Sequence, residues 1–287
     1  MAPIVLARLA ARLRCPSCAS PLELAADALV CSSGHSFDIA RQGYVALSRP
    51  HVKRAPGDTP AMVAAREGFM AAGHFRPIAR ALATAAADSL GADAQTERCV
   101  VDLGAGTGYQ LAAVLDHCRR AWGIALDASR PALRRAARAH PRMAAIGCDA
   151  WQELPLADAS ADLVINSFAP RNGAEITRVL RSHGALIVVR PTPAHLHELS
   201  AVLGMVAVDP RKRERLHAQL STGLRNEGAA ELDFTMELAR ADVEALVMMG
   251  PSAHHVTTEE LGRHLASVAD PMTVTASVIV ETFSREP

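Results

Sequence analysis

VVDLGAGTGYQ, from Val100 to Gln110, combines a short apolar strand, a glycine-rich turn and the start of a helix. After the turn, apolar residues recur at helical spacing, beginning with Leu111 and Val114. The stretch therefore predicts a strand–turn–helix unit. In open α/β sheets, nucleotide-like ligands bind at the carboxyl ends of the strands, where glycines let the backbone approach the ligand closely. We expect this turn to hold such a ligand.

Later segments read as strands alternating with helical stretches, which predicts a parallel, doubly wound α/β sheet. The expected strands are residues 121–126, 143–148, 161–166, 184–190, 234–238 and 272–283, and the expected helices are residues 59–72, 78–92, 131–139 and 241–249. Asp127 ends the second strand, where a carboxylate can accept hydrogen bonds from both hydroxyls of a ribose. A solvent-exposed acid is the alternative reading. Asp149 and Ala150 end the third strand, where an adenine would be recognised.

The glycine spacing distinguishes two kinds of ligand. A dinucleotide-binding turn reads G-x-G-x-x-G/A, whereas residues 104–108 read G-x-G-x-G with Tyr109 in the sixth place. VDLGAGTG, with Asp102 two residues before the first glycine, instead resembles the first motif of class I S-adenosylmethionine-dependent methyltransferases. That resemblance implies that Asp102 faces the amino-acid end of the cofactor and Asp127 its ribose.

Near the start of the chain, cysteines and a histidine have the spacing C-x2-C-x12-C-x3-H, at Cys15, Cys18, Cys31 and His35. Three thiolates and an imidazole can close a tetrahedron around zinc. Disulfides or unrelated buried thiols are the alternative. The short apolar stretches between these residues suit a small ribbon that needs metal to fold. The other three cysteines lie in apolar segments, where core packing explains them.

A basic stretch rich in turn-forming residues follows the ribbon, and it carries Arg49, Lys53 and Arg54. These side chains could neutralise nucleic-acid phosphates without reading sequence, while an ordinary solvated linker is the alternative. We therefore expect three parts: a zinc-binding ribbon at residues 1–48, a basic bridge with helices at 49–92, and a methyltransferase domain at 93–287.

Composition limits the class of protein. The chain has 287 residues, is 49% hydrophobic and has zero net charge, although residues 1–80 hold ten basic against five acidic residues. Arginine makes up 28 of the 30 basic residues, which indicates codon bias as much as phosphate recognition. No apolar run approaches the roughly 18 residues of a membrane span, and the first residues lack a signal-peptide pattern. We expect a cytoplasmic protein.

The order of parts is more specific than any one motif. The ribbon, FDIARQGYVALSR, a basic PGD turn, M-x-x-A-R-x-x-F-x-x-x-G-H-F-x-P and VDLGAGTGY together resemble the 23S ribosomal RNA (guanine-N1)-methyltransferases. That family includes macrolide (tylosin-type) resistance enzymes of antibiotic producers. The resemblance spans about residues 13 to 200. Thr107 stands where the family often has an acid, and Phe75 where it often has a tyrosine.

The resemblance implies zinc on the Cys3His set, S-adenosylmethionine as cofactor, a hairpin of 23S rRNA as substrate and a homodimer. It places Phe75, Gly106, Thr107 and His195 against the cofactor. With the residues already argued, the expected cofactor-binding set is Phe75, Asp102, Gly104, Ala105, Gly106, Thr107, Gly108, Asp127, Ala128, Asp149, Ala150, Asn166 and His195.

The implied reaction is attack of guanine N1 on the sulfonium methyl. N1 carries a proton at neutral pH, so a base would help. No acid follows the fourth strand, which leaves Asn166 and His195 as weak catalytic candidates, the former only as a hydrogen-bond partner of the base edge. Phe168 or Phe75 could stack on the target base. Two alternatives stay open: a small-molecule methyltransferase with a structural zinc cap, and a non-enzymatic RNA-binding protein.

Overall fold

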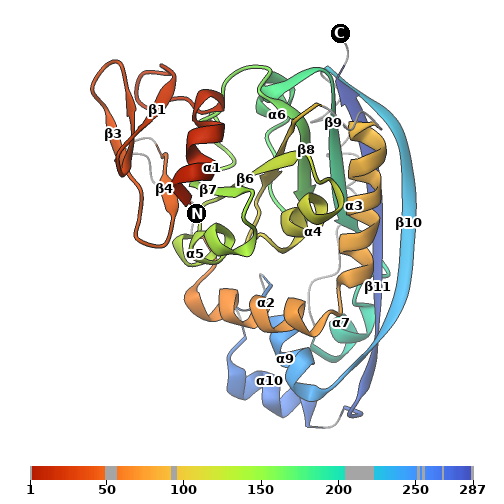
Figure 1. Cartoon of the computed structure of the whole chain (residues 1–287). Helices are drawn as coiled ribbons and strands as arrows, with labels where there is room; N and C mark the ends of the chain where they lie inside the picture. Colours follow the sequence, from red (N-terminus) through yellow and green to blue (C-terminus); the bar gives the residue numbers. More distant parts are fainter. Residues whose placement is uncertain are drawn as a thin grey trace.

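The computed structural model describes residues 2–48, 57–91, 96–203, 223–250, 253, 256–266 and 268–285. Within them, the core is an eight-stranded sheet of order β10-β11-β9-β8-β5-β6-β7-β4 (Figure 1). Its strands are β4 (Tyr44–Ala46), β5 (Arg98–Leu103), β6 (Ala121–Asp127), β7 (Met143–Gly147), β8 (Ala161–Ser167), β9 (Leu180–Pro191), β10 (Leu224–Leu238) and β11 (Met272–Arg285). The predicted doubly wound sheet is confirmed.

The sheet is mixed, whereas the alternation of strands and helices predicted a parallel sheet. Six neighbouring strands from β4 to β9 are parallel, but β11 pairs antiparallel with β9, and β10 pairs antiparallel with β11. The expected edge strand at residues 234–238 is part of a longer strand, β10. Alternation of side chains predicts that a segment is a strand, but it does not specify the direction of its neighbour.

Helices cover the two faces of the sheet unequally. On one face, α3 (Arg76–Leu90), α4 (Tyr109–His117) and α5 (Arg130–Ala139) bury apolar residues against the strands. On the other face lie α6 (Gly173–Val179) and, from the start of the chain, α1 (Ala2–Leu9). Residues 148–160, which connect β7 to β8, contain no helix. Helix α1 therefore covers apolar surface that this crossover leaves open.

The ribbon is joined to the sheet. After α1 and the 3-10 turn Ala10–Arg12, three short antiparallel strands form it: β1 (Leu22–Ala25), β2 (Ala28–Cys31) and β3 (Ser36–Asp38). The chain then enters β4, which pairs in parallel with β7. The division into residues 1–48, 49–92 and 93–287 stays a prediction; the β4–β7 pairing shows where the first part meets the sheet.

A group of helices lies across the carboxyl ends of the strands, below the sheet in Figure 1. They are α2 (Pro60–Ala72), α7 (His197–Leu203), α9 (Arg240–Met248) and α10 (Thr258–Leu265). Thr59 caps α2 by accepting a hydrogen bond from the Met62 N–H, and Pro60 occupies the first turn. None of the described helices is long and apolar enough to cross a membrane.

Candidate functional site

A cavity of about 460 Å³ opens at the carboxyl ends of β5, β6 and β8. Residues from α2, from α9 and from the C-cap of α9 close its opposite side, including Arg66, Met70, Leu246 and Met249. Ligand pockets for small molecules commonly span about 300–1,000 Å³. The cavity therefore has room for a nucleoside-sized ligand at the edge of the sheet that the glycine turn predicted.

The glycine turn needs glycine for two reasons. Gly104, Gly106 and Gly108 have φ of 81°, 55° and 81°, a region that side chains with a Cβ rarely adopt. Space is also short: a Cβ on Gly104 would lie 2.3 Å from the Cβ of Ala169. The Gly104 and Ala105 N–H groups both donate to the Leu126 carbonyl, at 2.9 and 3.0 Å. The turn is thereby held against the end of β6.

Asp127 joins the end of β6 to this turn. Its carboxylate oxygens accept hydrogen bonds from the Gly106 N–H at 2.8 Å and the Ser129 N–H at 2.7 Å. Burial raises the pKa of Asp127, and the two backbone N–H groups oppose that rise. Both oxygens keep lone pairs for further donors. The carboxylate is thus held in place at the cavity wall with capacity to bind hydroxyl groups.

Asp102 is a buried acid of the cavity wall with an unsatisfied oxygen. It is 1% exposed, and its Oδ2 has no hydrogen-bond partner among the described residues. Burial, and secondarily the charge of Asp127, raise the pKa of Asp102 to about 8. A buried carboxyl of this kind gains most from a cationic partner, because the partner would stabilise its ionised form. An ammonium group of a ligand fits this position.

Most of the expected cofactor residues meet in the cavity. Those that line it are Phe75, Asp102, Gly104, Ala105, Gly106, Thr107, Asp127, Ala128, Asp149, Ala150 and His195. Gly108 lies one step behind the lining, as the N-cap of α4. Asn166 is fully buried, and its Nδ2 donates to the Leu103 carbonyl at 2.9 Å and the Pro170 carbonyl at 3.0 Å. Both amide hydrogens are used, so Asn166 braces two segments and has no donor left for a base edge.

His195 lines the cavity as a neutral side chain. Its Nδ1 accepts a hydrogen bond from the Ser277 N–H at 3.1 Å, and burial lowers the pKa of His195 to about 4. Because Nδ1 is the acceptor, the ring proton of the neutral form is on Nε2. His195 can therefore donate a hydrogen bond to a ligand, but neither ring nitrogen is free to accept a proton.

Two residues that line the cavity, Arg66 and Trp151, were not predicted from the sequence. Arg66 Nη1 lies 2.6 Å from Asp58 Oδ2, and its Nη2 donates to the Met249 carbonyl at 2.8 Å. This arginine thus joins α2 to the end of α9 over the glycine turn. The motif M-x-x-A-R contains Arg66, so its place in the motif was the available signal. Trp151 also lines the cavity, although its side chain is 54% exposed.

The predicted metal ligands come together in the ribbon. The four ligand atoms of Cys15, Cys18, Cys31 and His35 all lie within 4.8 Å of one another. Cys18 Sγ is 3.6 Å from Cys31 Sγ, and His35 Nδ1 is 3.6 Å from Cys15 Sγ and 3.4 Å from Cys31 Sγ. Ligands about 2.0–2.3 Å from a tetrahedral zinc are separated by roughly 3.5–3.8 Å. The three cysteines are free thiols, so the set fits zinc and excludes the disulfide alternative.

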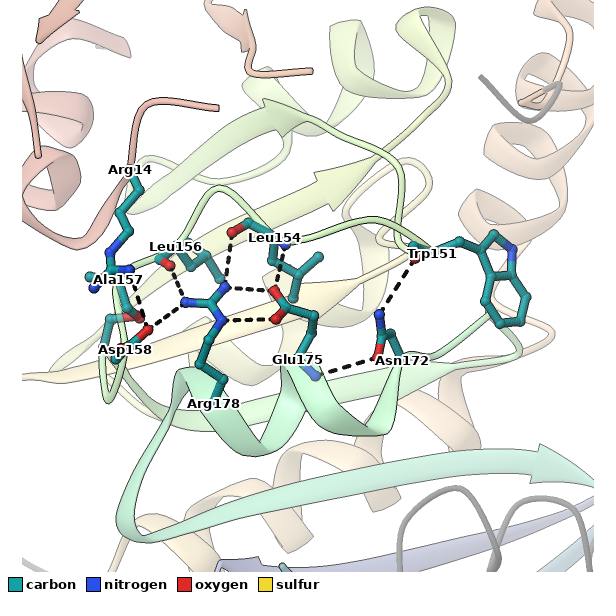
Figure 2. A network of polar contacts seen from close by, with 10 residues as sticks. Arg14, Trp151, Leu154, Leu156, Ala157, Asp158, Asn172, Glu175 and Arg178 are labelled. Atoms are coloured by element: carbon teal, nitrogen blue, oxygen red, sulfur yellow. Dashed lines mark hydrogen bonds and ion pairs between the residues drawn. The ribbon is translucent and has the colours of Figure 1, made fainter. Parts of the chain in front are cut away.

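A polar network connects the ribbon to the cavity wall (Figure 2). The Arg178 guanidinium donates to Glu175 Oε2 at 2.6 Å and to Asp158 Oδ1 at 2.8 Å. Asp158 also pairs with Arg14, the residue before the first zinc ligand, at 3.4 Å. The same guanidinium donates to the carbonyls of Leu154 and Leu156, at 3.0 and 2.7 Å. Residues 154–158 are thus held between α6 and the ribbon, next to the wall that carries Asp149 and Trp151.

Comparisons with known proteins agree with this geometry. Residues 13–55 match the zinc-ribbon family described as "RlmA, N-terminal", and residues 100–184 match the family "Methyltransferase domain". A "Putative 23S rRNA (guanine-N(1)-)-methyltransferase" of Micromonospora griseorubida is 50% identical over 93% of this chain and 95% of its own. The "23S rRNA (guanine(748)-N(1))-methyltransferase" of Streptomyces fradiae is 46% identical over 93% of this chain and 94% of its own. A solved structure described as a "putative methyltransferase" from Bacillus halodurans is 17% identical, covers 68% of this chain and 96% of its own, and has a TM-score of 0.49.

The comparisons confirm the predicted enzyme class and both cofactors. A methyltransferase domain uses S-adenosylmethionine, and Asp102 and Asp127 fit that cofactor's ammonium and ribose hydroxyls. The ribbon match agrees with the Cys3His cluster. Identity near one half extends over almost the full length of both relatives. The chain therefore belongs to the 23S rRNA (guanine-N1)-methyltransferase family.

Proposed function

We propose that this protein methylates N1 of a guanine in a hairpin loop of 23S rRNA. The observation that carries the proposal is the pairing of the cofactor cavity with a Cys3His ribbon in one fold, in a chain about half identical to relatives named for this reaction. The Streptomyces fradiae relative is named for guanine 748, and we expect the same nucleotide to be the target here.

The cavity residues support binding and alignment of the cofactor. We assign Asp102 to its ammonium, Asp127 to its ribose hydroxyls, and Asp149 with Ala150 to its adenine, because these residues line the cavity at the ends of three neighbouring strands. When bound, S-adenosylmethionine supplies an electrophilic sulfonium methyl. Alignment can account for much of such a reaction, since the sulfonium is a good leaving group. Neutral His195 serves as a hydrogen-bond donor in this scheme.

The RNA surface includes more than the basic bridge. The predicted contacts Arg49, Lys53 and Arg54 lie outside the described residues. Helix α5 begins beside Asp127 at the cavity edge and exposes three arginines with no ion pair among the described contacts, namely Arg130, Arg134 and Arg138. Such side chains can neutralise phosphates without reading bases. We assign both segments to the RNA-binding surface.

Methylation of isolated rRNA tests the proposed function. RNA and ribosomal subunits from cells that lack the enzyme are incubated with labelled S-adenosylmethionine, and the product is mapped by primer extension. An N1-methyl group blocks Watson–Crick pairing, so a stop at one guanine is expected. Absence of label in naked RNA and in subunits alike would overturn the proposal.

The two alternatives predict different results. A small-molecule methyltransferase would keep its turnover when Arg49, Lys53 and Arg54 are changed to glutamine, whereas the RNA enzyme would lose RNA affinity. A non-enzymatic RNA-binding protein would have no need of the cofactor site. Cofactor binding that is measurable in the wild type and lost in Asp127→Ala would contradict that alternative.

The family resemblance supports three further parts of the proposal. They are a homodimer, a cytoplasmic location on the ribosome and protection against a macrolide. Light scattering of the purified protein tests the first, and ribosome co-sedimentation from lysates tests the second. Expression in a macrolide-sensitive host tests the third: a rise in the inhibitory concentration with the wild type but not with Asp127→Ala is expected.

A further inference from the structure

Phe168, directly after β8, is an exposed aromatic residue in a strained backbone conformation. Its side chain is 43% exposed, and it lines the cavity. Its φ is 54°, in the left-handed region that a bulky residue with a Cβ rarely adopts. Such outliers persist where the surrounding structure enforces them, and they concentrate at functional sites. An exposed ring in an unfavourable conformation therefore calls for a reason beyond packing.

Three strands hold the turn that carries Phe168. The Phe168 N–H donates to the Val189 carbonyl of β9 at 3.1 Å. Asn166 braces the far side of the turn through its bonds to the Leu103 and Pro170 carbonyls. The Cβ of Ala169 approaches so near to Gly104 that only glycine fits opposite it. The backbone of this turn is thus set by β5, β8 and β9, and the ring is presented from a rigid position.

Two other rings support Phe168 from within the cavity. The centroid of Phe168 lies 6.3 Å from that of Phe75 and 5.7 Å from that of His195, with interplanar angles of 20° and 26°. Phe75 itself is only 3% exposed. It packs edge-on against Phe69 at 5.0 Å. Phe75 therefore has little surface for a base, while Phe168 keeps an open surface at the cavity mouth.

We propose that Phe168 is the stacking surface for the target guanine. The inference rests on the proposed function and decides between the two aromatic residues that the sequence offered. A loop base must leave the RNA stack to reach the cofactor, and an aromatic ring replaces part of the stacking it loses. Stacking restrains the base plane but leaves its N1 edge free. Phe168 would in this way hold the base while the cofactor occupies the deeper part of the cavity.

The test compares Phe168→Asn with Phe168→Tyr. Asparagine tolerates a positive φ and removes the ring, whereas tyrosine keeps the ring. The Asn variant should fold with an unchanged or higher melting temperature, bind S-adenosylmethionine within about twofold of wild type by calorimetry, and show a KM for the RNA hairpin raised on the order of 10- to 100-fold. The Tyr variant should stay close to wild type in all three measurements.

A fluorescent base gives a direct readout of stacking. The probe is the RNA hairpin with 2-aminopurine at the guanine that primer extension identifies, because stacking quenches this fluorophore. Its fluorescence should stay quenched in the wild-type and Phe168→Tyr complexes and rise in the Phe168→Asn complex.

Three outcomes would overturn the inference: equal RNA KM for the two variants, equal quenching in their complexes, or loss of cofactor affinity in Phe168→Asn with unchanged RNA KM. In each of them, methylation by the wild type keeps the proposed function intact. A wild type that methylates no guanine refutes that function itself.

Discussion

The zinc ribbon and the cofactor cavity are built in opposite ways. All four metal ligands lie between Cys15 and His35, and short local turns bring them together. The cavity instead gathers residues from Gly57 to Gly250, which the whole sheet and the helices across its end must position. A site made from one short segment can be predicted from the spacing of its residues in the sequence. For a site made from distant segments, only the residues that belong to a local motif can be predicted in this way.

The two regions are nevertheless joined. One continuous apolar cluster contains Leu6 of α1, Val45 of β4, Ile146 of β7 and Leu29 of the ribbon. The Arg178 network adds a polar connection between the ribbon and the cavity wall. The comparison therefore raises a question that experiments can answer: how far does the cavity depend on the ribbon?

Loss of zinc should have the largest effect. Changing Cys31 to serine removes one ligand of the Cys3His set, and structural zinc contributes about 10–16 kcal/mol to the folding of small zinc-finger peptides. We expect loss of bound zinc by elemental analysis, a large fall in melting temperature and weaker cofactor binding. Cys118→Ser is the matched control, because Cys118 is partly buried and lies outside the cluster. A Cys31→Ser protein with normal cofactor affinity would show that the regions are independent.

Breaking the polar connection should have an intermediate effect. Arg178→Ala leaves Glu175, whose side chain is 14% exposed, without its cation, and it frees the Leu154 and Leu156 carbonyls. A cost of about 1–3 kcal/mol in the free energy of unfolding is expected. Cofactor affinity should fall as well, because the adjoining wall carries Asp149 and Trp151.

Arg225→Ala is the control for this change. Arg225 pairs with Glu227 at 2.8 Å, but the two side chains are 66% and 38% exposed, so its loss should cost less than about 1 kcal/mol. Chemical denaturation and calorimetric titration of both variants provide the measurements. Equal effects of the two substitutions on cofactor affinity would mean that the Arg178 network does not support the wall.

Asp102→Asn should have opposite effects on folding stability and on cofactor affinity, and its effect on stability should depend on pH. The carboxyl ionises near pH 3.8 in the unfolded chain, whereas burial raises its pKa to about 8 in the fold. As pH rises between these values, the unfolded state loses this proton first, so the free energy of unfolding of the ligand-free protein falls. The Asn variant has no carboxyl at this position, so its free energy of unfolding does not fall for this reason.

The Asn variant should therefore gain stability relative to wild type as pH rises from about 4 to 8, with the largest gain near pH 8. Its cofactor affinity should fall, because the ammonium loses its ionised partner. Melting temperatures across this pH range and titrations at pH 8 check the two effects. A stability difference that does not change with pH would show that Asp102 is ionised in the ligand-free fold.

Removing surface arginines should have the smallest effect. Arg134→Gln with Arg138→Gln should weaken RNA binding and leave zinc content, melting temperature and cofactor affinity unchanged. If each arginine neutralises one phosphate, the slope of log K against log salt falls by about 0.7–0.9 per substitution. The control pair is Arg119→Gln with Arg263→Gln, two exposed arginines that are not part of α5. Equal salt-dependence slopes for the two pairs of substitutions would show that α5 is not part of the RNA-binding surface.

Several features of the site could be predicted from the sequence because their chemistry is local. The Cys3His spacing, the glycine turn and Asp127 depend on residues a few positions apart or on the ends of neighbouring strands. Asn166 shows what such reasoning leaves open. Its position at the end of a predicted strand suggested contact with a ligand, and the structure shows in addition that its amide group donates to the Leu103 and Pro170 carbonyls. Only long-range packing decides which way a side chain at a strand end points.

Local patterns in the sequence were sufficient to determine the strand–turn–helix unit, the metal ligands and the type of cofactor. Glycine, cysteine and aspartate are restricted there by backbone conformation and by ligand chemistry. The tertiary structure alone decided the antiparallel edge of the sheet, the covering of its second face by α1, and the neutral state of His195. It also decided that Phe168 is exposed at the cavity while Phe75 is buried. Each of these features depends on which distant segments come into contact, because those contacts determine which groups are buried and which are hydrogen-bonded.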